Sequence, residues 1–333
     1  TTGQGVDAFR EQLHERASAL QPRQADGVFR MPVQRVFSAK GFGTILTGIP
    51  ISGSVNTGDI LEVLPKGGKG KIRGLQAYHE GTDHARAGHS TAVNLSDVDH
   101  KQVARGAVLA TPGYFHAQSM LGASLRLLPS TPRGLGNRTP IRLHIGTAEV
   151  LGEVILLDEE QLEPGAGGLI QLRLGSPVVC APGDHFVLRR ASPVETLGGG
   201  VILEESRFRL KRFKSFVIDE LVRQAKSLGS PEALLESHLV RAPEMWLGVE
   251  DLTVTLKMPK GEVRDLLNIL GGKGRTVELT PDRWIHREAL DVAMDQLLAS
   301  VNAWFKDNPT RSRMDVRDLR AGIQFESALT DQL

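Results

Sequence analysis

The 333-residue sequence contains one cysteine, has no run of 18 apolar residues, and carries a formal net charge of only +1. The single cysteine excludes an internal disulfide framework. Because Cys180 lies in VVCAPGD, without a nearby base, we interpret it as a buried packing residue. The absence of a long apolar run excludes a transmembrane helix. The polar first twenty residues also lack the basic-then-apolar layout of a signal peptide, so we expect a cytoplasmic protein that does not bind membranes.

A nucleotide-binding loop is also missing. The stretch FSAKGFGTILTGIP, residues 37–50, sets a lysine beside glycines but matches neither G-x-x-x-x-G-K-[ST] nor G-x-G-x-x-G. A phosphate loop leads into a helix, whose positive end helps to hold the anion. Here the β-branched and apolar residues 44–47 predict a strand instead. We therefore interpret the stretch as a tight bend between two strands.

Metal and hydrolase motifs are absent as well. His79, His84 and His89 recur at five-residue intervals with Asp83 among them, which raises the question of a metal site. That spacing is not helical, and no cysteine accompanies the histidines, so we expect no metal site. The sequence also contains no G-x-S-x-G, C-x-x-C or H-E-x-x-H arrangement.

Charge is unevenly distributed despite the small net value. The run RFRLKRFK, residues 207–214, contains five cations in eight residues. A local basic patch is therefore expected in a protein that is not basic overall.

The chain divides into five parts by composition and hydrophobic periodicity. Residues 1–26 predict a turn and one helix, and the absence of a starting methionine suggests the tail of a longer protein. Residues 27–111 and 112–205 are rich in glycine and in period-two segments such as IRLHI (141–145), which predicts two antiparallel β-barrel domains. Residues 206–287 predict a winged helix, and residues 288–333 the start of a second one. The fold class is therefore two β-barrels followed by winged-helix modules.

The predicted helices and hairpin of the helical part follow one another in a recognisable order. Residues 213–228 place apolar side chains, among them Phe213, Phe216, Val217, Leu221 and Val222, on one broad helical face. Ser230 and Pro231 begin a second helix. Helices at 249–256 and 262–270, separated by KMPKG and followed by a hairpin over RTVELTPDRWIHR, give the order of a winged helix. Residues 290–305 predict a further amphipathic helix.

The segment FRMPVQRVFSAKGFGTILTGIPISGSVNTGDILEVLP, residues 29–65, closely resembles the second domain of translational GTPases. Within them it resembles the selenocysteine-specific elongation factors, the SelB family. The resemblance extends from TTGQGVDAFREQL, similar to the end of the family's nucleotide domain, through both barrels to the winged-helix extension. It implies that GTP binding and hydrolysis, with magnesium, belong to a preceding domain. This chain by itself is then expected to bind no cofactor and to be no enzyme.

The same resemblance implies the partners. The first barrel would receive the aminoacylated end of selenocysteinyl-tRNA for delivery to the ribosome, and the second barrel would touch the tRNA arm. The winged helices would reach toward the hairpin in selenoprotein mRNA. Two alternatives remain: a winged-helix DNA-binding regulator, and a fragment of a general translation GTPase. The second would not account for the helical tail.

The resemblance also implies site residues in the first barrel. Selenocysteine carries a selenol that is largely ionised at neutral pH, so a selective pocket needs a fixed cation in water-poor surroundings. Arg35 matches the family's pocket arginine. The chain departs from the family pattern at Gln34, where aspartate is frequent, and at Ser90, where a second arginine is frequent; His89 is a candidate replacement. The resemblance also places the bend between the two strands near the terminal adenosine of the tRNA, and a purely structural hairpin is the alternative. The bend comprises Lys40, Gly41, Phe42, Gly43 and Thr44.

Candidate RNA-binding cations lie in the helical part. They are Lys211, Arg212, Lys214, Lys260, Arg264, Lys273 and Arg275. The four in the winged helix are interleaved with acids, namely Glu262, Asp265, Glu278 and Asp282. We therefore favour a spacer role for this module over direct binding.

Overall fold

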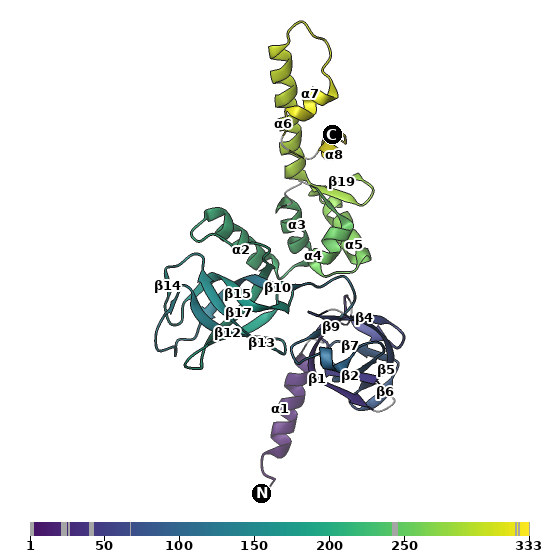
Figure 1. Cartoon of the computed structure of the whole chain (residues 1–333), viewed down its shortest axis with the longest axis vertical. Helices are drawn as coiled ribbons and strands as arrows, with labels where there is room; N and C mark the ends of the chain where they lie inside the picture. The colour runs from purple at the N-terminus through teal and green to yellow at the C-terminus, as the bar shows by residue number, and fades with distance from the viewer. Residues whose placement is uncertain are drawn as a thin grey trace. The chain divides into compact units, whose positions relative to one another are not determined.

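A computed structural model of the chain describes residues 3–20, 25, 27–39, 43–66, 68–241, 246–323, 325 and 327–332 (Figure 1). The chain folds into two compact units, residues 1–111 and residues 112–333. Each unit is built around a β-barrel, and the second also carries most of the helices.

The first element is the predicted helix α1 (Val6–Ala19). It begins after Gly5, whose φ of 85° is left-handed, and has Asp7 in its first turn and Arg16 in its last. Both charges are placed favourably for the helix dipole. None of its residues is buried, and Phe9 is 69% exposed. Packing inside the described chain therefore does not account for its apolar residues.

The first barrel is an antiparallel sheet that closes on itself in the order β4-β9-β1-β2-β8-β5, because β5 also pairs with β4. Its strands are β1 (Arg30–Ala39), β2 (Gly43–Gly48), β4 (Ile60–Leu64), β5 (Lys69–Ala77), β8 (Thr91–Leu95) and β9 (Val108–Ala110). β6 (Glu80–Thr82) extends β5, β3 (Ser54–Asn56) pairs with β7 (His84–Arg86), and a 3-10 turn covers His100–Gln102. Alternate residues such as Leu46, Val93 and Leu75 point inward and fill the core.

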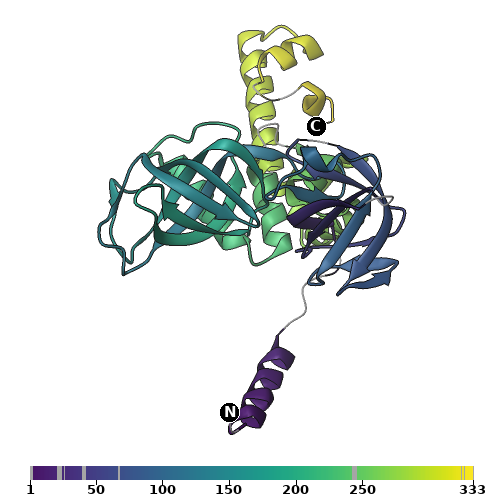
Figure 2. The ribbon, with the colours of Figure 1, turned by 60° about the horizontal axis from the view of Figure 1, so that its bottom comes forward.

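The second barrel closes in the order β10-β15-β13-β12-β16-β17. Its strands are β10 (Ala117–Leu127), β12 (Thr139–Ile145), β13 (Ala148–Leu156), β15 (Gly167–Val179), β16 (His185–Arg190) and β17 (Glu195–Glu205); β11 (Leu135–Gly136) pairs with β14 (Gln161–Leu162). Figure 2 shows both sheets curving round to close. The glycine run at 198–200 has a steric reason: a Cβ on Gly200 would lie 1.8 Å from the carbonyl oxygen of Ser124 on β10. The prediction of two antiparallel barrels is confirmed.

Helix α2 (Ser215–Ser227) packs on the second barrel, although the sequence placed it in the winged helix. Its buried Val217 and Leu221 join a cluster with Ile155 and Leu203 of the barrel. The predicted broad apolar face is narrower than expected, because Phe213, Phe216 and Val222 are exposed. The periodicity marked the helix correctly but could not show which of its apolar residues find partners.

The winged helix consists of α3 (Pro231–Arg241), β18 (Trp246–Gly248), α4 (Val249–Leu256), α5 (Lys260–Gly272), β19 (Thr276–Thr280) and β20 (Arg283–His286). The strands pair in the order β18-β20-β19. Its core comes from all three helices and from Trp284 of the hairpin. The predicted helix, turn, helix and hairpin are confirmed, while strand β18 was not foreseen.

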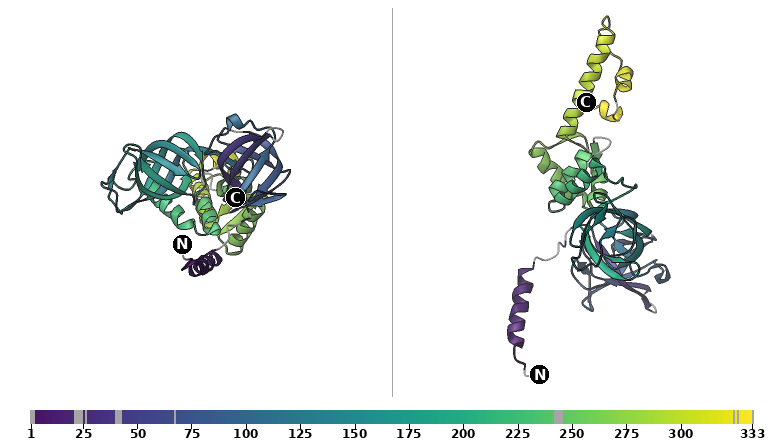
Figure 3. Two further views of the ribbon diagram at one scale, coloured as in Figure 1. Left: turned by 90° about the horizontal axis from the view of Figure 1, so that it is seen from below. Right: turned by 90° about the vertical axis from the view of Figure 1, so that its left-hand side faces the viewer.

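The C-terminal elements are α6 (Arg287–Asp307), α7 (Val316–Ala321) and α8 (Ser327–Thr330). Figure 3 shows the long α6 running out from the winged helix with α7 folded back beside it. Leu329 returns to pack with Trp246 and Ile285. None of the described helices combines the length and apolar content needed to cross a bilayer.

Candidate functional site

A β-bulge presents Gln34 and Arg35 on the first barrel. Val33 pairs with Gly48 and Arg35 pairs with Thr47, so Gln34 is the extra residue of β1. Gln34 and Arg35 are both exposed, whereas Val33 is fully buried. A bulge re-aims side chains in this way, because one inserted residue changes which face the following residues take. The arginine and the residue before it thus both reach the surface.

Arg35 lies in a cross-strand row on the outer surface of the sheet. Its partner Thr47 pairs with Ala92 of β8, which pairs with Gln76 of β5. Thr47 and Ala92, the two neighbours of Arg35 in this row, have short side chains. Arg35 itself is exposed. The described residues do not form the water-poor surroundings expected for a selenol pocket, and a bound ligand would have to exclude the water.

The bend that follows is described only in part. Lys40, Gly41 and Phe42 lie outside the described residues. Gly43 has a φ of 85°, in the left-handed region that favours glycine, and pairs with Ala39. Thr44 is buried, and its hydroxyl donates to the carbonyl oxygen of Val98. Thr44 is therefore a packing residue, while Gly43 fits the expected bend.

His89 and Ser90 lie at the entry to β8, on the same sheet as Arg35. Ser90 is exposed, and its carbonyl accepts from the Tyr78 N–H at 2.9 Å. The His89 ring lies 5.4 Å from that of Tyr78, and its Nε2 accepts from Arg86 Nε at 3.0 Å. From the strand spacing, Ser90 and Arg35 are separated by roughly 12 Å along the sheet.

Arg86 was missed by the sequence analysis. It reaches His89 because the chain turns between them, with the His89 N–H donating to the Arg86 carbonyl at 3.2 Å and Gly88 at a φ of 88°. The signal was Gly88 at the third position of the turn, where a left-handed φ favours glycine. Arg86 thus stands beside His89, four residues before position 90, where the family pattern places its second arginine.

The three evenly spaced histidines have separate partners. His84 Nδ1 lies 3.1 Å from Asn56 Oδ1, whereas His89 contacts Arg86 and Tyr78. His79 has a left-handed φ of 73°. Among the described residues, no three potential ligands come together in a metal-binding group.

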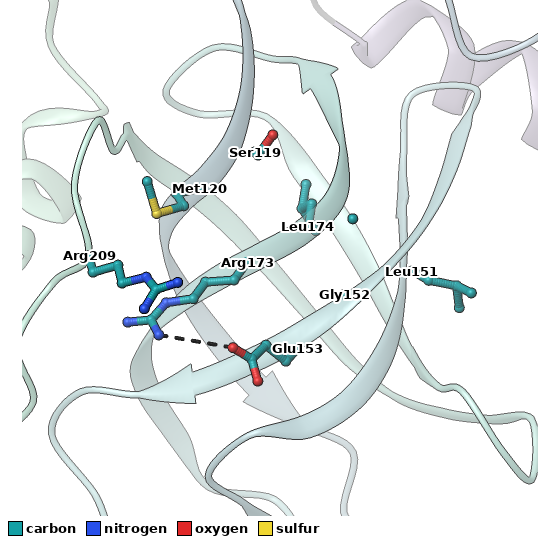
Figure 4. Close-up of a pocket in the computed structure, with 9 residues that line it drawn as sticks. Ser119, Met120, Leu151, Gly152, Glu153, Arg173, Leu174 and Arg209 are labelled. Carbon is teal, nitrogen blue, oxygen red and sulfur yellow. Dashed lines mark ion pairs between the residues drawn. The ribbon is translucent and has the colours of Figure 1, made fainter.

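A hollow of about 610 Å³ on the outside of the second barrel gathers arginines (Figure 4). Arg173 of β15 lies opposite Glu153 of β13, with 4.0 Å between its Nη1 and the carboxylate. The guanidinium of Arg209 lies alongside that of Arg173. Burial, and next the repulsion from Arg209, lower the pKa of Arg173 from its ordinary value. Met120 and Leu174 give the hollow apolar walls.

The candidate cations of the winged helix are committed to internal ion pairs. Arg264 lies 2.5 Å from Asp282, and Lys260 lies 3.1 Å from Glu250 and 3.4 Å from Asp282. The hydrogen bond from Arg264 is the main cause that lowers the pKa of Asp282. The hairpin cations contact α3: Lys273 pairs with Glu232, and Arg275 with Glu236, each at 2.5 Å. These contacts favour a spacer over a nucleic-acid reader.

The cations before α2 differ from one another. Lys211 and Lys214 are exposed and have no ion-pair partner in the described part of the chain. Arg212 instead donates from Nε to the Leu156 carbonyl at 2.8 Å and from Nη2 to the Glu159 carbonyl at 3.0 Å. Arg212 is therefore an anchor for the chain, and the two lysines remain available to a ligand.

One lysine joins the winged helix to the second barrel. Lys257 ends α4 in a left-handed conformation, with a φ of 56°, and its Nζ lies 3.1 Å from Glu205 at the end of β17. The lysine side chain is 7% exposed and the glutamate side chain 16%. Lys257 also lies over the Phe115 ring, 5.5 Å from its centroid. This pair is largely shielded from water.

Two family models match the chain. Residues 123–207 match the model described as selenocysteine-specific elongation factor, beta-barrel domain, and residues 43–110 match elongation factor Tu domain 2. A selenocysteine-specific elongation factor from Desulfomicrobium baculatum is 31% identical over 324 residues, which are 97% of this chain and 51% of that protein. The one from Escherichia coli K12 is 28% identical over 98% of this chain and 50% of its own length. The chain thus spans about half the length of these curated relatives.

Solved structures agree on the fold. A bacterial selenocysteine-specific elongation factor, EF-Sec, aligns with a TM-score of 0.72 at 21% identity, over 99% of this chain and 51% of that one. The apo form of translation elongation factor SelB from Methanococcus maripaludis aligns with a TM-score of 0.55 at 23% identity, over 61% of this chain and 48% of that one. At these identities the likeness concerns the fold alone.

Proposed function

Because this chain belongs to the selenocysteine-specific elongation factor family, we propose that its first barrel binds the aminoacyl end of selenocysteinyl-tRNA for delivery to the ribosome. The observation that carries this proposal is the bulge that turns Gln34 and Arg35 outward, beside the short side chains of Thr47 and Ala92. Arg35 supplies the fixed positive charge for a selenolate.

In this proposal the bound tRNA end itself shields Arg35 from water. Arg35 is exposed in the chain alone. When the tRNA end covers the row, the guanidinium and selenolate lose water together, which strengthens their attraction. Arg86, held beside His89, supplies the second positive charge that the sequence lacks at Ser90.

Nucleotide chemistry is assigned elsewhere. This sequence contains no phosphate-loop motif. We infer that GTP and magnesium bind the part of the family's proteins that this chain does not span, and that this chain alone hydrolyses no GTP. The winged helix serves as an arm toward the ribosome-bound mRNA hairpin, because its cations are internally paired.

The test is a comparison of one tRNA carrying selenocysteine or serine. The chain should protect the selenocysteinyl ester from hydrolysis at lower concentration than the seryl ester. Arg35→Ala should reduce this preference by about tenfold, equivalent to about 1.4 kcal/mol. Arg133→Ala, which removes an exposed arginine of the second barrel, should leave it unchanged. Equal protection of both esters by wild type and Arg35→Ala would refute the assignment.

A further inference from the structure

Residues 207–216, RFRLKRFKSF, combine five cations and three phenylalanines and contain no acidic residue. The aromatic side chains stand outside the core: Phe208, Phe213 and Phe216 are 79%, 47% and 68% exposed. Folding buries little apolar area at these positions, so packing does not explain them. A concentrated basic and aromatic surface of this kind marks a binding site.

The backbone of the 207–216 segment is held firmly to the barrel. Gln171 of β15, which is fully buried, donates from Nε2 to the Phe208 carbonyl at 2.8 Å, and its Oε1 accepts from the Leu210 N–H at 3.2 Å. Farther along, the Phe213 N–H donates to the Leu157 carbonyl at 2.7 Å. The backbone of the segment is therefore already fixed, so binding does not have to pay for ordering it.

Phe213 has an unusual conformation. Its φ of 56° is left-handed, which a bulky residue rarely adopts. The Arg212 guanidinium lies 4.6 Å from the centroid of its ring. The structure thus keeps an aromatic ring partly exposed, with a cation on it, at a strained position. Strain of this kind collects at functional sites.

Neighbouring side chains of the segment lie along two hollows. Arg209 joins Arg173 in the hollow of Figure 4, where the carboxylate of Glu153 pairs with Arg173. Arg207 and Phe208 line a second hollow of about 440 Å³. The guanidinium groups of Arg173 and Arg209 repel each other, and a bound anion such as a phosphate would relieve that repulsion.

We propose that residues 207–216, together with Arg173, bind single-stranded RNA. Unpaired bases stack on the exposed phenylalanines, and the phosphates between them meet Arg209, Lys211 and Lys214. A double helix fits less well, because its bases already stack on one another and offer no free faces to these rings. An acidic peptide would satisfy the cations but would leave three aromatic faces without a planar partner. The inference goes beyond the proposed function, because it needs neither selenocysteine nor the first barrel.

The experiment titrates this chain into a fluorescently labelled 12-nucleotide oligouridine. Phe208→Ala and Phe216→Ala should each weaken binding by about tenfold, the loss of one stacked base. Phe9→Ala is the matched control, because Phe9 is 69% exposed on α1. Replacing Lys211 and Lys214 by alanine should lower the salt slope of binding by about 1.4, at 0.7 per phosphate contact on a single strand. Replacing Lys66 and Lys69 in the first barrel is the charge-matched control.

Three results would overturn the inference. One is unchanged oligouridine affinity in the phenylalanine variants. Another is equal or tighter binding of a 12-base-pair RNA duplex, which would indicate contact with phosphates alone. The third is tighter binding of an oligoglutamate peptide than of the oligouridine. Arg35→Ala should not affect oligouridine binding, so failure of the tRNA proposal and failure of this one give different patterns.

Discussion

The 207–216 segment and the winged helix both carry clusters of cations, but those cations have different partners. In the winged helix, Lys260, Arg264, Lys273 and Arg275 each contact an acid. In the segment, Lys211 and Lys214 have no such partner among the described residues. A count of charges along a sequence therefore does not identify a nucleic-acid surface, since tertiary contacts decide which charges are left for a ligand.

The largest effect on stability should come from Lys257, whose ion pair with Glu205 is largely shielded from water. Lys257→Met leaves Glu205 buried without its partner and should lower the free energy of unfolding by about 3 kcal/mol. All three tryptophans lie between residues 246 and 304, so urea unfolding followed by tryptophan fluorescence reports on this part of the chain. Lys306→Met removes an exposed lysine from α6 and should change the midpoint little. A Lys257→Met midpoint equal to that of Lys306→Met would contradict the role of this pair.

The next effect concerns the support of the segment. Gln171→Leu removes both hydrogen bonds to the Phe208 carbonyl and the Leu210 N–H and should cost about 2 kcal/mol. Hydrogen exchange at the Leu210 amide should become faster. Gln161→Leu, at an exposed position of β14, is the control. Unchanged exchange in Gln171→Leu would show that the segment does not depend on this side chain.

Asp282→Asn tests whether ion pairing keeps the winged helix from binding nucleic acid. The change removes the ion-pair partner of Arg264 and one of the two partners of Lys260. Affinity for duplex DNA at low salt should therefore rise by about threefold, because one added phosphate contact is a modest gain. Asp251→Asn, a charge-matched change at another exposed acid of the same module, should give a smaller rise. Equal rises in both variants would show that net charge alone matters.

The same carboxylate gives a pH dependence. Arg264 and Lys260 lower the native pKa of Asp282 below its ordinary value of 3.8. Its contribution to stability is therefore present above that ordinary value and is lost as the pH falls through the lowered native value. The stability difference between wild type and Asp282→Asn should be constant near neutral pH and vanish in stronger acid. A difference that stays constant into strong acid would contradict the pairing.

The smallest effect on stability should come from Lys214, an exposed lysine. Lys214 precedes α2, and its side chain caps nothing. A cation at the start of a helix opposes the helix dipole, so Lys214→Ala should change stability by about 0.5 kcal/mol or less, with any change stabilising. Thermal unfolding measures it. A clear loss of stability would show that Lys214 has a structural role and is not available to a ligand.

Much of the fold could be predicted from local signals. Period-two segments and glycine turns indicated the barrels, and Pro231 and the hairpin at 275–287 marked the elements of the winged helix. The packing of α2 could not be predicted, because periodicity shows an apolar face but not the surface that it covers. Val217 and Leu221 pack against the barrel, whereas Phe216 is exposed.

The candidate site was harder to predict. The resemblance indicated Arg35, but the bulge that exposes it together with Gln34 depends on the register between β1 and β2. Arg86 reaches His89 only through the turn at Gly88. Arg173 and Arg209, 36 residues apart in the sequence, meet because the chain returns across the barrel after β17. Contacts of this kind depend on long-range register and are not encoded in short motifs.

Hydrogen exchange measured with and without selenocysteinyl-tRNA shows whether the first barrel seats the aminoacyl end of that tRNA. The amides of residues 34–48 and 89–95 should exchange more slowly with selenocysteinyl-tRNA than with the same tRNA uncharged. If the two tRNAs give identical exchange across these residues, or differ only within residues 112–333, the aminoacyl end does not bind the first barrel.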